Sequence, residues 1–154
     1  MVTLYMFVGL PGAGKTVQAR KLMEKSRFVH VTERDAYKAV SRKCEPEKLS
    51  REISKWLSRK VRRNLLKGKS VICNASNLSA GRRQKLLNDI GDINCKKVCI
   101  VVNRDRKACK ETVKEMYTET PEYFANLLNC CVEKVTKKEG WDTIVTVNTK
   151  DEDM

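Results

Sequence analysis

Five short apolar runs divide the chain, and longer stretches with apolar residues at helical spacing separate them. The first run, Val2 to Val8, is an unbroken series of β-branched, aromatic and aliphatic residues. The other four are Arg27–Val31, Ser70–Cys73, Lys97–Val102 and Ile144–Val147. Runs of this length without polar alternation are typical of strands buried on both faces of a parallel sheet. The pattern therefore predicts five strands.

The stretches between these runs predict helices. The expected helices start after Thr16, run from Ala36 to about Arg42, from Glu45 to Gly68, from Ser79 to Gly91, from about Lys107 to Tyr117, and from Thr120 through Val135. Strands that alternate with helices predict an α/β fold, here a three-layer sandwich with a five-stranded parallel sheet and helices on both faces. We expect residues 1–154 to form one domain, with a frayed tail at 150–154.

Polar segments follow four of the predicted strands. They are Gly9–Thr16, Thr32–Asp35, Asn74–Asn77 and Asn103–Arg106. Right-handed crossovers bring the carboxyl ends of parallel strands to one edge of the sheet, where α/β proteins bind their ligands. We therefore expect these segments to converge on one site.

The first of these segments is a glycine-rich loop. Its sequence, GLPGAGKT, satisfies the pattern G-x-x-x-x-G-K-[ST], and it lies between a predicted strand and a predicted helix, as that motif requires. Glycines let backbone N–H groups converge on phosphates at the positive end of a helix. Lys15 can pair with the β- and γ-phosphates, and the Thr16 hydroxyl can ligate Mg²⁺. The motif predicts a site for ATP and Mg²⁺ formed by Gly9, Gly12, Ala13, Gly14, Lys15, Thr16 and Val17.

The chain is strongly basic. Lys and Arg total 32 against 19 acidic residues, a net charge of +13. Many of the basic residues belong to the predicted helix that ends at Gly68, on faces that its apolar stripe does not use: Arg51, Lys55, Arg59, Lys60, Arg62, Arg63, Lys67 and Lys69. This charge favours a nucleic-acid partner, and a merely solvated basic surface is the alternative.

Several classes of protein are disfavoured. The sequence after the last strand, NTKD, has the wrong order for a guanine-specificity motif, and the third strand ends in Asn74 where a motor ATPase normally has a metal-holding acid. Seven cysteines without a C-x-x-C pair argue against a zinc site or a disulfide framework. No run is apolar enough to span a membrane, and the chain begins directly in a strand, so we expect a cytoplasmic protein.

Asp35 is the best candidate for a catalytic acid or base. A carboxylate at a strand end that faces the γ-phosphate can accept the proton of an attacking hydroxyl. The alternative is a helix N-cap, because a helix follows directly. His30 is interpreted as a core or sheet-face residue.

Taken together, these segments resemble the 5′-polynucleotide kinases, the family of phage end-healing kinases and of kinase domains in nucleic-acid repair enzymes. The matches are the glycine loop, Arg34-Asp35-Ala36-Tyr37, Asn77-Leu78 with the paired Arg82-Arg83, and Gly140-Trp141-Asp142 before the last strand. The resemblance implies a P-loop kinase fold with a helical lid, in which Asp35 activates a 5′-hydroxyl. It also implies that the acceptor contacts Arg34, Asp35, Lys38, Asn77, Arg82 and Arg83.

The chain departs from the family pattern at several positions. Lys38 stands where the family has an acceptor-clamping arginine, and Asn74 where an acid is common. The lid helix offers Lys110 and Lys114 as cations for the transferred phosphate, with Arg104 and Arg106 just before it. Tyr37 either stacks on an acceptor base or packs within its helix.

These observations lead to three hypotheses. The first is an ATP-dependent kinase, with Lys15, Asp35, Lys110 and Lys114 as catalytic residues, that phosphorylates the 5′-hydroxyl of a nucleic acid in end repair. The second is a kinase of the same fold that acts on a small molecule such as a nucleoside or sugar nucleotide. The third is a nucleic-acid-binding protein that uses ATP only as a switch.

Overall fold

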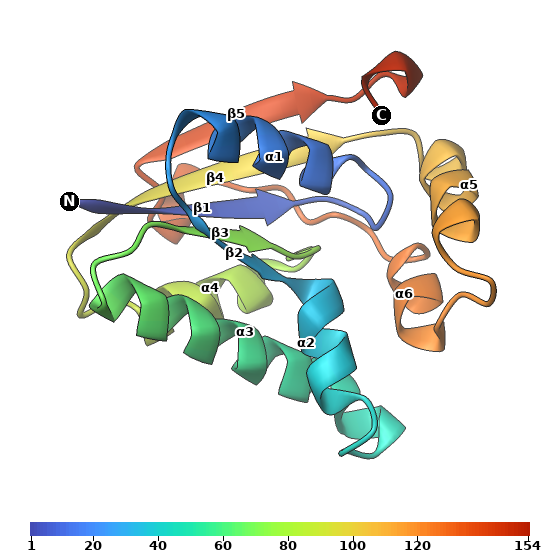
Figure 1. Ribbon diagram of the computed structural model, residues 1–154, viewed down its shortest axis with the longest axis horizontal. Coiled ribbons are helices and arrows are strands. Elements are labelled where there is room, and N and C mark those ends of the chain that lie inside the picture. Colours follow the sequence, from blue (N-terminus) through green and yellow to red (C-terminus); the bar gives the residue numbers. More distant parts are fainter.

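A five-stranded parallel sheet forms the centre of the molecule, as the sequence predicts (Figure 1). The computed structural model describes all of residues 1–154. In the order β2-β3-β1-β4-β5, the strands are Val29–Thr32, Val71–Asn74, Val2–Val8, Cys95–Asn103 and Thr143–Asn148. Every neighbouring pair is parallel, so all five carboxyl ends lie at one edge. The α/β fold with helices on both faces is therefore confirmed.

The central strand β1 is buried on both faces. Leu4, Met6 and Val8 point into one core, and Phe7 points into the other, all fully buried. Leu4 aligns with Val71 of β3 on one side and with Lys97 of β4 on the other. Full burial of such side chains contributes about 1.5–3 kcal/mol each, so this strand anchors the loop that follows it.

Helices cover the two faces of the sheet separately. α1 (Lys15–Lys25) packs on one face, and α3 (Leu49–Leu66) and α4 (Ala80–Asp89) pack on the other (Figure 1). The stripe of α3 buries Ile53, Leu57, Val61 and Leu65 at helical spacing. A 3-10 turn, Pro46–Lys48, precedes α3, so the α-helix begins later than the predicted Glu45. None of the helices has both the length and the apolar character that crossing a membrane requires.

Three more helices lie at the carboxyl edge. α2 (Glu33–Val40) continues directly from β2, whereas α5 (Arg106–Met116) and α6 (Glu122–Leu127) stand beyond the ends of β1 and β4 (Figure 1). We call the α5–α6 pair the lid. It forms the side of the site that faces the glycine loop and α2.

The last predicted helix is shorter in the structure. It ends at Leu127, and the following residues run as an extended segment that crosses the molecule. The carbonyls of Glu133 and Lys134 accept hydrogen bonds from Arg83, and the Glu133 N–H donates to the Leu78 carbonyl. Long-range partners therefore replace the hydrogen bonds that a continued helix would have made.

The tail that the sequence predicts to fray contains a 3-10 turn, Asp151–Asp153, and the exposed Asp151 pairs with Arg104 at 3.0 Å. This pair places the end of the chain near the glycine loop, since Arg104 also donates to the Gly12 carbonyl.

Candidate active site

The glycine loop presents the free N-terminus of a helix. Gly12 and Gly14 have φ of +82° and +102°, a region that other residues rarely adopt. A Cβ on Gly12 would lie 2.6 Å from the Cys109 carbonyl oxygen, so α5 can approach the loop only because this residue is glycine. Gly14 is the N-cap of α1, and no side chain caps the helix. The N–H groups of the first turn therefore stay available to an anion.

Lys15 folds back over this loop. Its Nζ donates to the carbonyls of Gly9 at 2.9 Å and Leu10 at 2.7 Å, and only 8% of the residue is exposed. Burial lowers its pKa to about 8, although the nearby Glu33 and Cys109 oppose this shift. The ammonium is therefore held where phosphates would meet the loop, in surroundings that disfavour its charge until an anion arrives.

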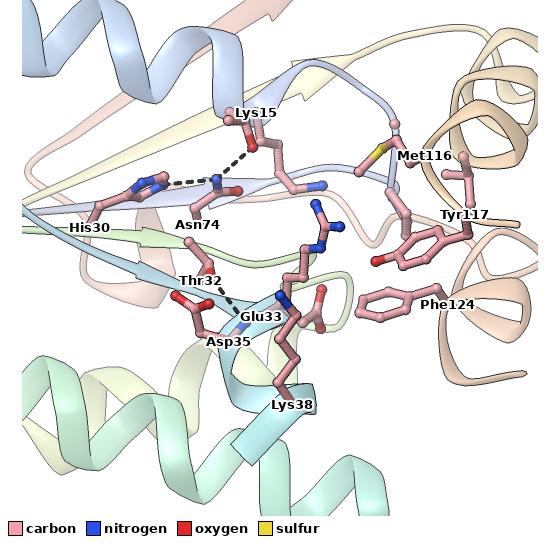
Figure 2. Close-up of a pocket in the computed structure, with 15 residues that line it drawn as sticks. Lys15, His30, Thr32, Glu33, Asp35, Lys38, Asn74, Met116, Tyr117 and Phe124 are labelled. Atoms are coloured by element: carbon pink, nitrogen blue, oxygen red, sulfur yellow. Dashed lines mark hydrogen bonds between the residues drawn. The ribbon is translucent and has the colours of Figure 1, made fainter. Parts of the chain in front are cut away.

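Thr16 is held by a short chain of hydrogen bonds. The Asn74 amide donates to Thr16 Oγ1 at 3.1 Å and lies 3.0 Å from His30 Nε2 (Figure 2). Burial lowers the pKa of His30, so a neutral ring can accept from the amide. His30 thus lies at the site, not only on the sheet as predicted, and Asn74 orients the hydroxyl next to the loop.

Asp35 lies in the first turn of α2, not at its N-cap. Thr32 is the cap, and its side chain accepts from the Asp35 N–H at 3.0 Å. The alternative capping role for Asp35 is therefore wrong, because Thr32 already fills that position. The Asp35 carboxylate is exposed at the cavity (Figure 2).

A cavity of about 430 Å³ joins these groups. It is lined by Pro11, Gly12, Lys15, Thr16, His30, Thr32, Glu33, Arg34, Asp35, Lys38, Asn74, Val113, Met116, Tyr117 and Phe124. The predicted convergence of the glycine loop with the β2 and β3 ends is thus present. The cationic residues Arg34 and Lys38 are exposed on the same helix as Asp35.

The lid supplies the apolar side of this cavity. Tyr117 and Phe124 stack with ring centroids 5.8 Å apart, and the Arg34 guanidinium lies 5.3 Å from the Tyr117 centroid. Tyr37 is not among the lining residues; it packs against Phe124 and Tyr123. This favours the packing alternative for Tyr37. The aromatic side chains that line the cavity are instead Tyr117 and Phe124 of the lid.

Glu33 is a site residue that the sequence analysis did not single out. It is buried, and one carboxylate oxygen accepts from the Ser76 N–H at 3.0 Å and hydroxyl at 2.8 Å. The other oxygen accepts from the Tyr123 hydroxyl at 2.7 Å. Burial and the Glu33 carboxylate raise the pKa of Tyr123, which keeps its proton on the phenol. Glu33 therefore connects α2, the turn after β3 and the lid.

Three residues predicted to contact substrate do not line the cavity. The Asn77 amide donates to the Phe7 carbonyl at 2.8 Å, and Arg83 is fully buried, 2.8 Å from Glu139. Both stabilise the turn after β3, so their predicted substrate contact is not supported. Arg82 points elsewhere: it donates to Ser50 in the crevice between α3 and α4.

The predicted lid cations are also outside the cavity. Lys110 and Lys114 are exposed on α5 and do not line it. Arg104 donates to the Gly12 carbonyl at 2.8 Å and to Thr112 at 2.6 Å, so it braces α5 against the loop. Arg106 donates to the Leu128 carbonyl and joins α5 to the end of α6. In this conformation Lys15, Arg34 and Lys38 are the cations of the cavity.

Comparison with solved structures agrees with this architecture. Kti12 of Chaetomium thermophilum, solved with ADP-AlF3, is 20% identical, with a TM-score of 0.72 over 96% of this chain and 90% of that chain. A sugar kinase from Janibacter sp. is 11% identical, with a TM-score of 0.69 over 96% of this chain and 86% of that chain. A chain of the Pnkp1/Rnl/Hen1 RNA repair complex is 19% identical, with a TM-score of 0.63 over 83% of this chain and 44% of that chain. At these identities the likeness shows the fold alone.

The family is shown by sequence. No curated protein matches the chain. A family model described as "AAA domain" matches residues 4–146, which include the glycine loop and the whole sheet except the first two residues of β1 and the last two of β5. The chain therefore belongs to this AAA domain family and has a nucleotide-binding P-loop kinase-like fold.

Proposed function

We propose that this protein is an ATP-dependent kinase that phosphorylates the 5′-hydroxyl of a nucleic acid, a reaction that restores broken strand ends for repair. One observation carries the proposal: the exposed carboxylate of Asp35 opens into the same cavity as Lys15 and Thr16 of the glycine loop. A hydroxyl held by Asp35 would face the terminal phosphate of a nucleotide on that loop. The resemblance of Arg34-Asp35 and its flanking residues to the 5′-polynucleotide kinases supports this choice of acceptor.

The glycine loop would bind the triphosphate. The N–H groups at the uncapped N-terminus of α1 donate to phosphate oxygens, and Lys15 exchanges its two carbonyl partners for the β- and γ-phosphates. Thr16 fits a Mg²⁺ ligand because its hydroxyl is exposed at the cavity and Asn74 already fixes one side of it. Together with phosphate oxygens and water, that hydroxyl would hold Mg²⁺, which supplies charge neutralisation of the phosphates.

Asp35 would then act as the base. It accepts the proton of the 5′-hydroxyl while the oxygen attacks the γ-phosphorus, and the bond to the β,γ-bridging oxygen breaks to release ADP. Lys15 and Arg34 stabilise the charge on the transferred phosphoryl group. Lys38 pairs with a phosphate of the acceptor, and the half-buried Tyr117 lines the cavity where its base would lie.

The test is transfer of labelled γ-phosphate to a 5′-OH oligonucleotide. Asp35→Asn should reduce kcat by about 10²–10⁴, the usual contribution of a general base, and leave the ADP affinity within about twofold. Glu24→Gln, an exposed carboxylate on α1 outside the cavity, is the matched control and should retain full activity. Full activity in Asp35→Asn would refute the mechanism.

A small-molecule acceptor is the second candidate, favoured by the sugar kinase among the structurally similar proteins. Salt discriminates between the two, because an oligonucleotide loses affinity as salt rises and a small, weakly charged acceptor does not. Binding of both ATP and oligonucleotide without any transfer would instead support the ATP-switch hypothesis.

A further inference from the structure

We propose that the crevice between α3 and α4 binds the phosphodiester backbone of the acceptor strand beyond its 5′ end. This inference rests on the proposed function for the identity of the strand. The crevice consists of two adjoining hollows of about 410 and 350 Å³, which share Lys85. Its cationic residues are Arg51, Lys55, Arg59, Arg62, Arg82 and Lys85. We call this feature the basic groove.

Half of the cations of the basic groove form no ion pair: Lys55, Arg62 and Lys85 pair with Glu52, Asp92 and Asp89, whereas Arg51, Arg59 and Arg82 are unpaired. Only two acids line it, Glu47 and Asp89. Arg51 and Arg59 are exposed and form no ion pair. Lys85 pairs with Asp89 at 3.3 Å on the exposed helix surface, where such ion pairs contribute little to stability and are easily exchanged for other partners. The groove therefore attracts a polyanion.

The floor of the groove suits a chain of phosphates. Ser54 and Ser58, one helical turn apart, are 9% and 6% exposed, and opposite them Gly81 has open space where a Cβ would be. Small residues here let a backbone approach closely, and hydroxyls and arginines are common phosphate donors. No hydrophobic residue lines either hollow. A protein partner would need apolar anchors, so nucleic acid fits this surface better.

The groove begins next to the proposed active site. Arg82 belongs to the groove and also lies beside Tyr123, where it opposes the rise in the pKa of that phenol. The Tyr123 hydroxyl donates to Glu33, which lines the cavity. The Tyr123 side chain thus separates Arg82 of the groove from Glu33 of the cavity. A strand with its 5′ end at Asp35 can therefore continue past Arg82 onto α3.

The other end of the groove is closed. Arg62 makes two hydrogen bonds to Asp92, at 2.6 and 2.8 Å, and a third to the Asp89 carbonyl at 2.8 Å, so its guanidinium is already occupied. The open part runs from Arg51 to Arg59, about 12 Å at 1.5 Å per helical residue. At about 3.4 Å per nucleotide this length covers three to four nucleotides.

Binding of a fluorescent 5′-OH single strand of about 12 nucleotides, followed by anisotropy in the absence of ATP, tests the groove directly. Loss of one phosphate contact costs about fourfold at 0.15 M salt for a single strand, so Arg51→Gln/Arg59→Gln should raise Kd about fifteenfold and reduce the salt slope by about 1.4. Arg63→Gln/Lys67→Gln removes the same charge from exposed positions of α3 and its C-cap outside the groove. This control should change Kd less than twofold.

Kinetics separate the groove from the active site. In Arg51→Gln/Arg59→Gln, KM should rise about fifteenfold for the oligonucleotide and stay unchanged for a nucleoside 3′-monophosphate, which is too short to reach α3. The groove proposal would be overturned if the groove variant and the control lost affinity for the strand equally, or if neither lost any. It would also be overturned if polyglutamate at equal charge displaced the strand. Groove-dependent binding without phosphate transfer would support the groove and refute the kinase.

Discussion

Raising the pH should weaken nucleotide binding through Lys15. In the unliganded protein, burial lowers the pKa of this lysine to about 8, whereas the ordinary value is 10.5. Bound phosphates stabilise the ammonium and return its pKa toward the ordinary value. The protonated form therefore binds tightly, and the affinity falls as the pH rises through 8.

The size of the effect follows from these two values. At pH 7 the unliganded lysine is about nine-tenths protonated, and at pH 9 it is about one-tenth protonated. Since the liganded lysine stays protonated over this range, Kd for ADP should rise about tenfold between pH 7 and pH 9, which corresponds to about 1.4 kcal/mol. Near pH 8, binding should take up about half a proton per ADP.

Isothermal titration calorimetry of ADP measures both quantities, Kd against pH and proton uptake from buffers of different ionisation enthalpy. Lys15→Arg is the control, because a guanidinium keeps its charge throughout this range and should give an almost flat Kd. Lys15→Met should bind weakly at every pH. A flat Kd in the native protein, or an equal slope in Lys15→Arg, would refute the assignment of the pH dependence to Lys15.

Three further substitutions test the framework of the site. Arg83→Met leaves the Glu139 carboxylate without its partner and should lower the free energy of unfolding in urea by about 3–5 kcal/mol. Tyr123→Phe removes the donor to Glu33 and should cost about 1–3 kcal/mol in the same measurement, with no change in ADP affinity. Gly12→Ala places a Cβ 2.6 Å from a backbone carbonyl at a positive φ, so calorimetry should show ADP affinity reduced at least tenfold. An unchanged free energy of unfolding in Arg83→Met or Tyr123→Phe, or an unchanged ADP affinity in Gly12→Ala, would contradict the corresponding contact.

The fold and the nucleotide side of the site could be predicted because they depend on short stretches of sequence. A buried strand, a glycine loop and a helix follow one another between Val2 and Lys25, and each has a local pattern. The convergence of the carboxyl ends follows from parallel topology, whereas the order β2-β3-β1-β4-β5 is a feature of the structure that no local pattern predicts. Where the sequence analysis erred, in the helix after Thr120, partners distant in sequence replace the hydrogen bonds of a continued helix.

The paired arginines of α4 show why the acceptor side was harder to predict. Because they are neighbours in a helix, their side chains point in directions that differ by about 100°. Both are arginines, so their residue type does not show which one faces a ligand. Arg83 faces inward and donates hydrogen bonds to Glu139 and to the backbone carbonyls of Glu133 and Lys134. Arg82 faces the crevice between α3 and α4, where its Nη2 donates to Ser50 and no acid pairs with it.

Glu33 is a second residue whose role could not be predicted from the sequence. Its partners Ser76 and Tyr123 lie 43 and 90 residues away, so no local pattern distinguishes it from the neighbouring Asp35. Of two acids two positions apart in one helical turn, Glu33 is buried and accepts three hydrogen bonds, and Asp35 is exposed at the cavity. Only Asp35 therefore presents its carboxylate where a substrate hydroxyl can reach it. Glu33, by holding α2, the turn after β3 and the lid together, fixes the turn of helix on which Asp35 is presented.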